Sequence, residues 1–155
     1  MRECTITADG TTTITYGTAD LAGNVEASRS LVVRVDRTPP DVACSVSPST
    51  LWPPNHKLVT VGAHVAVTDA TSGPAGFELV AVSSSEPESG TDPDDLAGDI
   101  VGWTPGTSDA SGQLRAERSG AGSGRIYTLT FAGRDRAGNQ ATCSDTVQVP
   151  HDMGR

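Results

Sequence analysis

The chain has 155 residues, a formal net charge of −8, 17 glycines, 10 prolines and only 4% aromatic residues. This length allows one full domain and part of another, and the sequence has no run of about 18 apolar residues that could cross a membrane. The acidic balance argues against a nucleic-acid-binding protein, which needs a basic surface. Abundant turn residues and small β-formers favour an all-β fold of short strands.

The first predicted element is a β-hairpin. Alternating runs at residues 11–16 and 31–35 flank the segment Asp20-Leu21-Ala22-Gly23-Asn24. Glycine and asparagine tolerate the positive φ of tight turns, and we expect the aspartate to accept backbone N–H bonds within the turn. The prolines of Asp36-Arg37-Thr38-Pro39-Pro40 then predict a stiff, extended connector. We place a domain boundary here, between residues 1–37 and 38–152.

The second part of the chain reads as a complete set of short strands. Seven alternating or apolar runs follow the connector, at residues 42–46, 59–67, 77–81, 100–103, 114–118, 125–131 and 143–149. About seven strands in roughly 110 residues is the count of an immunoglobulin-like (Ig-like) β-sandwich. We expect the glycine-rich segment 119–124 to form a hairpin connection between the fifth and sixth of these strands.

The turn of the first hairpin is repeated. Asp135-Arg136-Ala137-Gly138-Asn139 follows Phe131 as the first copy follows Tyr16. A repeat near 115 residues suits a string of β-sandwich modules and is too long for a solenoid. Residues 1–37 would then supply the last strands of a truncated repeat, which are marginal alone unless they pack on a neighbour. The N-terminus lacks signal-peptide features. A cytoplasmic protein and a piece of a longer exported chain both fit this, and the repeat favours the second.

These motifs resemble two families of modules. Residues 3–40 are similar to the C-terminal half of bacterial Ig-like surface repeats, through the segment 13–26 and the terminal Val-Asp-Arg-Thr-Pro-Pro at 35–40. Residues 38–150 resemble the hyalin-repeat (HYR-like) Ig-like modules. The matching motifs are Thr-Pro-Pro followed by a cysteine at 38–44 and Asp-x-x-Gly-Asn followed by a cysteine at 135–143.

The resemblance to HYR-like modules bears on the pairing of the cysteines. Cys44 and Cys143 fall on the first and last predicted strands, which can run side by side in such sandwiches. The resemblance implies a disulfide bond between them, and therefore an oxidising, extracellular or cell-surface setting. The alternative is two buried free thiols that act as small apolar side chains. Cys4 has no assigned partner.

One segment accounts for the charge imbalance. Between Lys57 and Arg115 the sequence has no lysine or arginine but nine acidic residues. Calcium takes 6–8 oxygen ligands in flexible geometry, so no cofactor is required but a structural calcium ion is one interpretation, with candidate ligands Glu86, Asp92, Asp94, Asp95 and Asp99. A solvated acidic loop is the other interpretation. A second calcium option lies at the connector, with Asp36, Asp41 and Asp69.

The sequence does not predict an enzyme. It has no Gly-x-Ser-x-Gly elbow, and its glycine-rich segment lacks the lysine of a phosphate-binding loop. The resemblance implies a non-catalytic spacer or adhesion scaffold in a secreted or surface multidomain bacterial protein, with neighbouring Ig-like domains as partners. The alternative is a module that binds a glycan or a cell-surface protein, either alone or as an accessory to a secreted hydrolase. Trp103 would then be the aromatic platform, although it also fits a place in the core.

Overall fold

The computed structural model describes residues 4–88 and 96–152, and every regular element within them is a β-strand. The first part holds β1 (Gly10–Tyr16) and β2 (Arg29–Val35). The second part holds β3 (Asp41–Ser47), β4 (Leu58–Thr68), β5 (Pro74–Ser84), β6 (Ile100–Val101), β7 (Ser111–Arg115), β8 (Gly124–Asp135) and β9 (Gln140–Pro150). The described residues contain no helix that could cross a membrane. The all-β prediction is confirmed, and the described residues after the connector form the seven expected strands.

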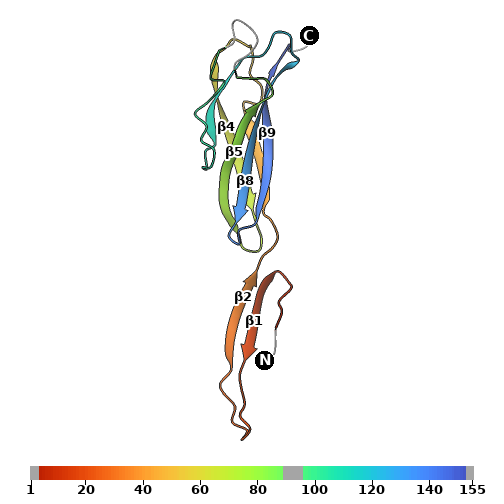
Figure 1. The fold of residues 1–155 in the computed structure, drawn as a ribbon, viewed down its shortest axis with the longest axis vertical. Coiled ribbons are helices and arrows are strands. Elements are labelled where there is room, and N and C mark those ends of the chain that lie inside the picture. Colours follow the sequence, from red (N-terminus) through yellow and green to blue (C-terminus); the bar gives the residue numbers. More distant parts are fainter. Residues whose placement is uncertain (1–3, 89–95, 153–155) are drawn as a thin grey trace.

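The seven later strands form a β-sandwich of two antiparallel sheets (Figure 1). One sheet has the order β3-β4-β7-β6 and the other the order β5-β8-β9. Alternation along β8 shows how the sequence builds the inner face. Tyr127, Leu129 and Phe131 are fully buried, whereas the threonines between them are half-exposed. Burying one large apolar side chain contributes about 1.5–3 kcal/mol.

The core lies where the two inner faces meet. Its fully buried apolar members come from five strands: Val61, Leu79, Leu114, Tyr127, Leu129, Phe131, Val147 and Val149. The sheets approach closely at Gly133 on β8, where a Cβ atom would lie 2.6 Å from Cγ2 of Val42 and 2.8 Å from Cγ2 of Val67. A glycine is therefore required here by packing, because any side chain would displace both valines.

A disulfide bond joins the two sheets at one edge of the sandwich. Cys44 on β3 is bonded to Cys143 on β9, and their Cα atoms are 6.0 Å apart. The two strands run along each other as predicted, although they belong to different sheets. The Val46 N–H donates to Oδ2 of Asp145 (2.8 Å) across the same edge. The predicted cysteine pairing is thus present, and the bond indicates an oxidising environment. Cys4 is free and exposed.

Two local predictions after residue 110 were wrong. The fifth strand of the sandwich spans Ser111–Arg115 and not 114–118. Segment 119–124 does not close a hairpin, because β7 pairs with β4 and β6 while β8 pairs with β5 and β9. This segment therefore carries the chain from one sheet to the other. Glycine and serine mark a turn without indicating which strands it joins.

The hairpin of β1 and β2 forms a sheet of its own and extends the long axis of the sandwich (Figure 1). The two copies of the repeated turn have the same geometry. Asp20 accepts from the Asn24 N–H (2.9 Å) and from its Nδ2 group (2.6 Å). Asp135 accepts the same two bonds from Asn139, at 2.8 and 2.7 Å. The predicted hairpin and the predicted role of its aspartate are confirmed.

Candidate functional site

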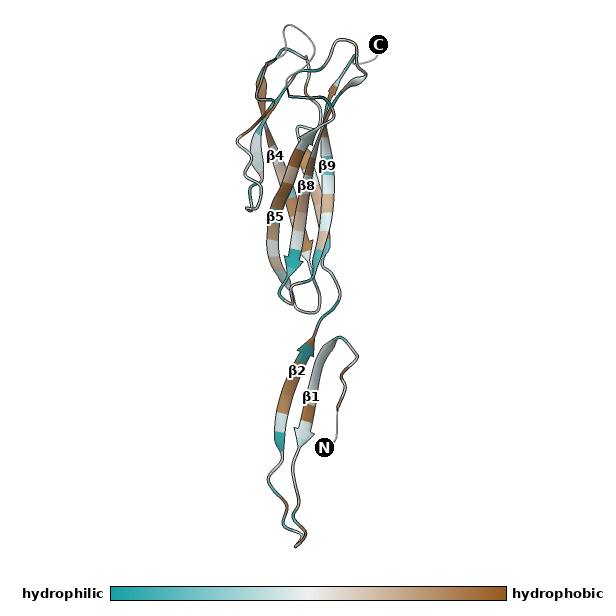
Figure 2. Ribbon diagram, in the orientation of Figure 1, coloured by the Kyte–Doolittle hydropathy of each residue, from teal (hydrophilic) through white to brown (hydrophobic). Residues whose placement is uncertain are grey.

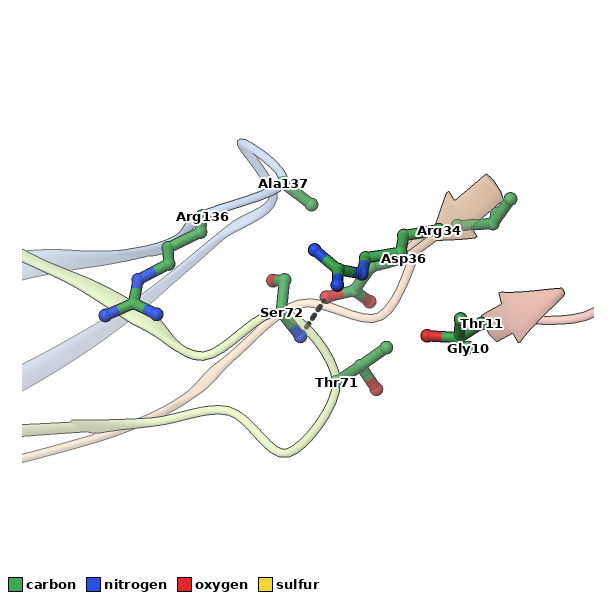
Figure 3. Close-up of a pocket in the computed structure, with 9 residues that line it drawn as sticks. Gly10, Thr11, Arg34, Asp36, Thr71, Ser72, Arg136 and Ala137 are labelled. Carbon is green, nitrogen blue, oxygen red and sulfur yellow. Dashed lines mark hydrogen bonds between the residues drawn. The ribbon is translucent and has the colours of Figure 1, made fainter. Parts of the chain in front are cut away.

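The connector, residues 36–40, is fixed to the sandwich by the residue that follows β2. Oδ1 of Asp36 accepts a hydrogen bond from the Thr38 N–H (3.1 Å). Its Oδ2 accepts from the backbone N–H of Ser72 (3.1 Å), in the loop between β4 and β5 (Figure 3). Pro40, at the other end of the connector, is buried. The Asp36 carboxylate therefore accepts one hydrogen bond from within the connector and another from the sandwich.

The turn between β8 and β9 holds the connector from a second side. The Nδ2 group of Asn139 donates to the carbonyl oxygens of Asp36 (3.2 Å) and Thr38 (3.4 Å). The same group also donates to Asp135, which is only 3% exposed and sets the asparagine side chain in place. The sequence predicted this turn but not its contact with the connector. In the sequence, the repeated asparagine is the one feature that pointed to this contact.

The hairpin holds the connector from the opposite side. Nε of Arg37 donates to Oδ1 of Asp9 (2.9 Å), and the guanidinium group also contacts the Thr7 carbonyl oxygen. Oγ1 of Thr38 donates to Oδ2 of Asp9 (3.1 Å). The hydrogen bond from the Arg37 side chain lowers the pKa of Asp9 below its ordinary value. Exposed pairs of this kind are individually weak, yet here several converge on two consecutive connector residues.

Three carboxylates meet where the connector enters the sandwich, and we call them the acidic cluster: Asp36, Asp69 and Asp135. One oxygen of each lies within 4.8 Å of the others. Oxygen ligands of this kind suit calcium, and the cluster is where the described residues could hold such an ion. The structure brings together Asp36 and Asp69 of the second calcium option, with Asp135 in the place predicted for Asp41, and calcium binding there stays a prediction. Asp41 is exposed at the start of β3, beside the inward-facing Val42.

Asp69 organises the loop that contacts the connector. Its Oδ1 accepts backbone N–H bonds from Thr71 (3.1 Å), Ser72 (2.8 Å) and Gly73 (2.7 Å). The bond from Gly73 is the largest cause of a pKa below the ordinary aspartate value. A cleft of about 470 Å³ lies beside this loop, and Arg34 reaches into it from the hairpin side (Figure 3).

The first calcium prediction concerned the acidic segment, and two of its residues contact arginine. Oε2 of Glu86 lies 3.1 Å from Nε of Arg125. Asp99 is fully buried, with one carboxylate oxygen against Nη1 of Arg125 and the other 3.2 Å from Nε of Arg115. Arg115 and Arg125 therefore place positive charge beside two of the five candidate ligands. The remaining candidate ligands are Asp92, Asp94 and Asp95. They lie outside the described residues, so the calcium site stays a prediction.

Arg125 is the centre of a buried polar network that the sequence did not predict. It is 2% exposed and also donates to the Tyr127 hydroxyl group (3.2 Å). Burial alone would lower the pKa of Arg125, but the bonds to Tyr127, Asp99 and Glu86 outweigh burial and raise it. Burial raises the pKa of Tyr127 to about 12. Arg125 therefore stays charged at neutral pH, and its side chain ties Glu86 and Asp99 to β8.

Trp103, the candidate aromatic platform, lies partly buried against the core. Its indole ring covers Gly112 on β7, where a Cβ atom would collide with it. The Nε1 atom of Trp103 is buried and has no hydrogen-bond partner among the described residues. This placement agrees with a packing role, and ligand binding by Trp103 stays a prediction.

The geometry defines a disulfide-bonded β-sandwich that carries a preceding β-hairpin on a tightly bonded connector. Comparison of the chain with known protein families, with curated protein sequences and with solved structures gave no match in any of the three.

Proposed function

We propose that this chain is a non-catalytic, rigid spacer in a secreted or surface-attached protein built from Ig-like modules. The observation that carries this proposal is the connector, which is bonded from the sandwich side by Asn139 and from the hairpin side by Asp9. A spacer must transmit orientation from one module to the next. Hydrogen bonds on both sides of two consecutive residues, next to two prolines, restrict that orientation.

Further features support an extracellular role. The Cys44–Cys143 bond ties the exposed edge of the sandwich, which suits an oxidising compartment. The Thr-Pro-Pro and Asp-x-x-Gly-Asn motifs resemble those of HYR-like modules. The same turn, with the same aspartate and asparagine bonds, recurs in the hairpin and in the sandwich. A repeated turn is the expected signature of repeated modules joined by similar connectors.

Nuclear magnetic relaxation of backbone amides tests the proposal directly. In the unmodified chain we expect the hairpin and the sandwich to tumble as one elongated body. The double variant Arg37→Ala/Asn139→Ala removes the Arg37 side-chain bond to Asp9 on the hairpin side and the Asn139 bonds to the connector on the sandwich side, so the hairpin should reorient more freely. Each lost hydrogen bond is worth about 0.5–1.5 kcal/mol, which is enough to shift such an equilibrium.

The chain offers a matched control. Asn24 makes the same bond within its turn as Asn139 but lies in the other copy of the turn, between β1 and β2. Asn24→Ala should therefore leave the relative tumbling unchanged. If the hairpin of the unmodified chain already reorients freely, the connector transmits no orientation and the spacer proposal fails.

A further inference from the structure

The disulfide bond joins the two strands through which a pull on the sandwich would enter and leave it. β3 follows the connector at one end of the sandwich, and β9, the last strand, ends at the opposite end (Figure 1). The chain just beyond β3 runs parallel to β9, because Thr50 forms a parallel bridge with Gln148. Tension along the long axis therefore acts along β3 and β9, which the Cys44–Cys143 bond connects.

The bond leaves little of the sandwich in the path of that tension. Cys44 is the fourth residue of β3, and Cys143 is the fourth residue of β9. The path consists of residues 41–44, the bond and residues 143–150, whereas residues 45–142 lie in the loop that the bond closes. The twelve residues of this path span about 40–43 Å when fully extended, and the two cysteine Cα atoms are 6.0 Å apart. The 11 residues of β9 already span about 36 Å in the folded strand, so the sandwich can lengthen by only roughly 10–15 Å while the bond holds.

Without the bond, the same tension would have to slide whole strands past their neighbours. β3 pairs with β4 over seven residues, and β9 pairs with β8 over eleven. Antiparallel hydrogen bonds lie perpendicular to the strands, so a pull along a strand loads the bonds of its ladder together. Two backbone bonds oppose the same sliding: the Leu51 N–H donates to the Gln148 carbonyl oxygen (2.8 Å), and the Gln148 N–H donates to the Ser49 carbonyl oxygen (2.9 Å). These ladders therefore resist tension even in a sandwich whose disulfide is reduced.

The hairpin is loaded in a different way. The chain enters β1 and leaves β2 at the same end of the hairpin, where Gly10 opposes Val35. A pull on the two sides of the hairpin therefore separates this pair first and the other pairs one at a time. The hydrophobic residues of β2 lie on an exposed two-stranded sheet (Figure 2), and Leu31 and Val32 are 53% and 54% exposed. Little apolar burial within the described chain opposes the separation, so the hairpin opens under a smaller load than the sandwich.

We propose that the Cys44–Cys143 bond is a force-bearing lock that fixes the length of the sandwich under tension, while the hairpin in series with it is the part that yields. Full opening of the hairpin, residues 10–35, adds roughly 90 Å. Complete unfolding of residues 41–150 without the bond would add roughly 320–360 Å more. The lock goes beyond a rigid spacer, because a chain can hold its orientation at rest and still lengthen when it is pulled. Free reorientation of the hairpin at rest would refute the spacer and leave the lock intact.

Stretching single molecules between handles at the two ends of the chain tests the proposal. All chains carry Cys4→Ser, so that the exposed free thiol neither joins two chains nor exchanges with the disulfide. As the load rises, the oxidised chain should lengthen through the hairpin and the terminal segments, without any step of about 300 Å or more. The same chain after reduction with dithiothreitol should show a step of roughly 320–360 Å, and this step should follow the opening of the hairpin.

Two variants separate the covalent lock from the bonds around it. Cys44→Ala/Cys143→Ala should lengthen like the reduced chain; if it does not fold, the reduced chain, which folds before its bond is broken, decides alone. Asp145→Ala is the matched control, because it removes the hydrogen bond from the Val46 N–H across the same edge but keeps the disulfide. Its oxidised form should show no long step. A long step in any oxidised chain, or a reduced chain that reaches only the oxidised length, would overturn the lock. A sandwich that yields before the hairpin would overturn the assignment of the yielding part.

Discussion

Replacing both Cys44 and Cys143 with alanine should lower the free energy of unfolding of the sandwich by about 4–5 kcal/mol. The bond closes a loop with a sequence separation of 99 residues, and the chain-entropy model gives about 4.7 kcal/mol for a loop of that length. The native edge keeps its hydrogen bond from the Val46 N–H to Asp145 (2.8 Å) without the disulfide. The loss therefore comes mainly from the greater freedom of the unfolded chain.

Urea unfolding followed by tryptophan fluorescence measures this loss, because Trp52 and Trp103 both belong to the sandwich. Asp145→Ala is the control, since it weakens the same edge in the native state without changing the freedom of the unfolded chain. It should cost about 1.5–3 kcal/mol, the range for a hydrogen bond to a charged group. A loss below about 1 kcal/mol for the double cysteine variant would refute the argument from loop closure.

Three further predictions concern packing and charge. Gly133→Ala should destabilise the sandwich by about 1–3 kcal/mol in urea unfolding, because its new Cβ would crowd two valines. Gly62→Ala, with nothing within 4 Å of its Cβ, should cost far less, and equal losses would contradict the packing argument. Arg125→Met should cost up to about 3–5 kcal/mol at pH 7, because it removes one of the two arginines that pair with the buried Asp99 carboxylate; a thermal melt within a degree of the unmodified chain would disprove this. The pKa of Asp69 is lowered in the folded state. Its contribution to stability is therefore present above the ordinary aspartate pKa and is lost as the pH falls through the lowered value. Asp69→Asn should make acid unfolding less steep, and an unchanged acid limb would count against that contribution.

The repeated turn could be predicted from the sequence because its bonds are local. Asp20 and Asn24 are four residues apart, and so are Asp135 and Asn139. Each aspartate accepts two hydrogen bonds from an asparagine that the turn itself brings into reach. The contact of Asn139 with the connector could not be predicted in this way. It joins residues about 100 positions apart, and only the packed sandwich brings them together.

The inward direction of Arg125, the centre of the buried polar network, could have been predicted from the sequence. Arg125 has the same parity as Tyr127, Leu129 and Phe131, so the alternation of β8 directs it inward. An arginine on an apolar face needs a carboxylate partner, because an unpaired buried charge is costly. The identity of that partner was not predictable. Asp99 lies 26 residues earlier and contacts Arg125 only through the folded sandwich.

By itself the sequence determined the number and approximate positions of the strands, the two repeated turns and the cysteine pair, because alternation and turn chemistry act over a few residues and the cysteines match a recognisable module pattern. The tertiary structure alone decided which strands share a sheet and which acidic residues meet. Segment 119–124 crosses between sheets, and Asp135 replaces Asp41 in the acidic cluster. Both outcomes depend on contacts between residues that are distant in the chain. The packing of two inner faces selects those contacts, and no local pattern encodes them.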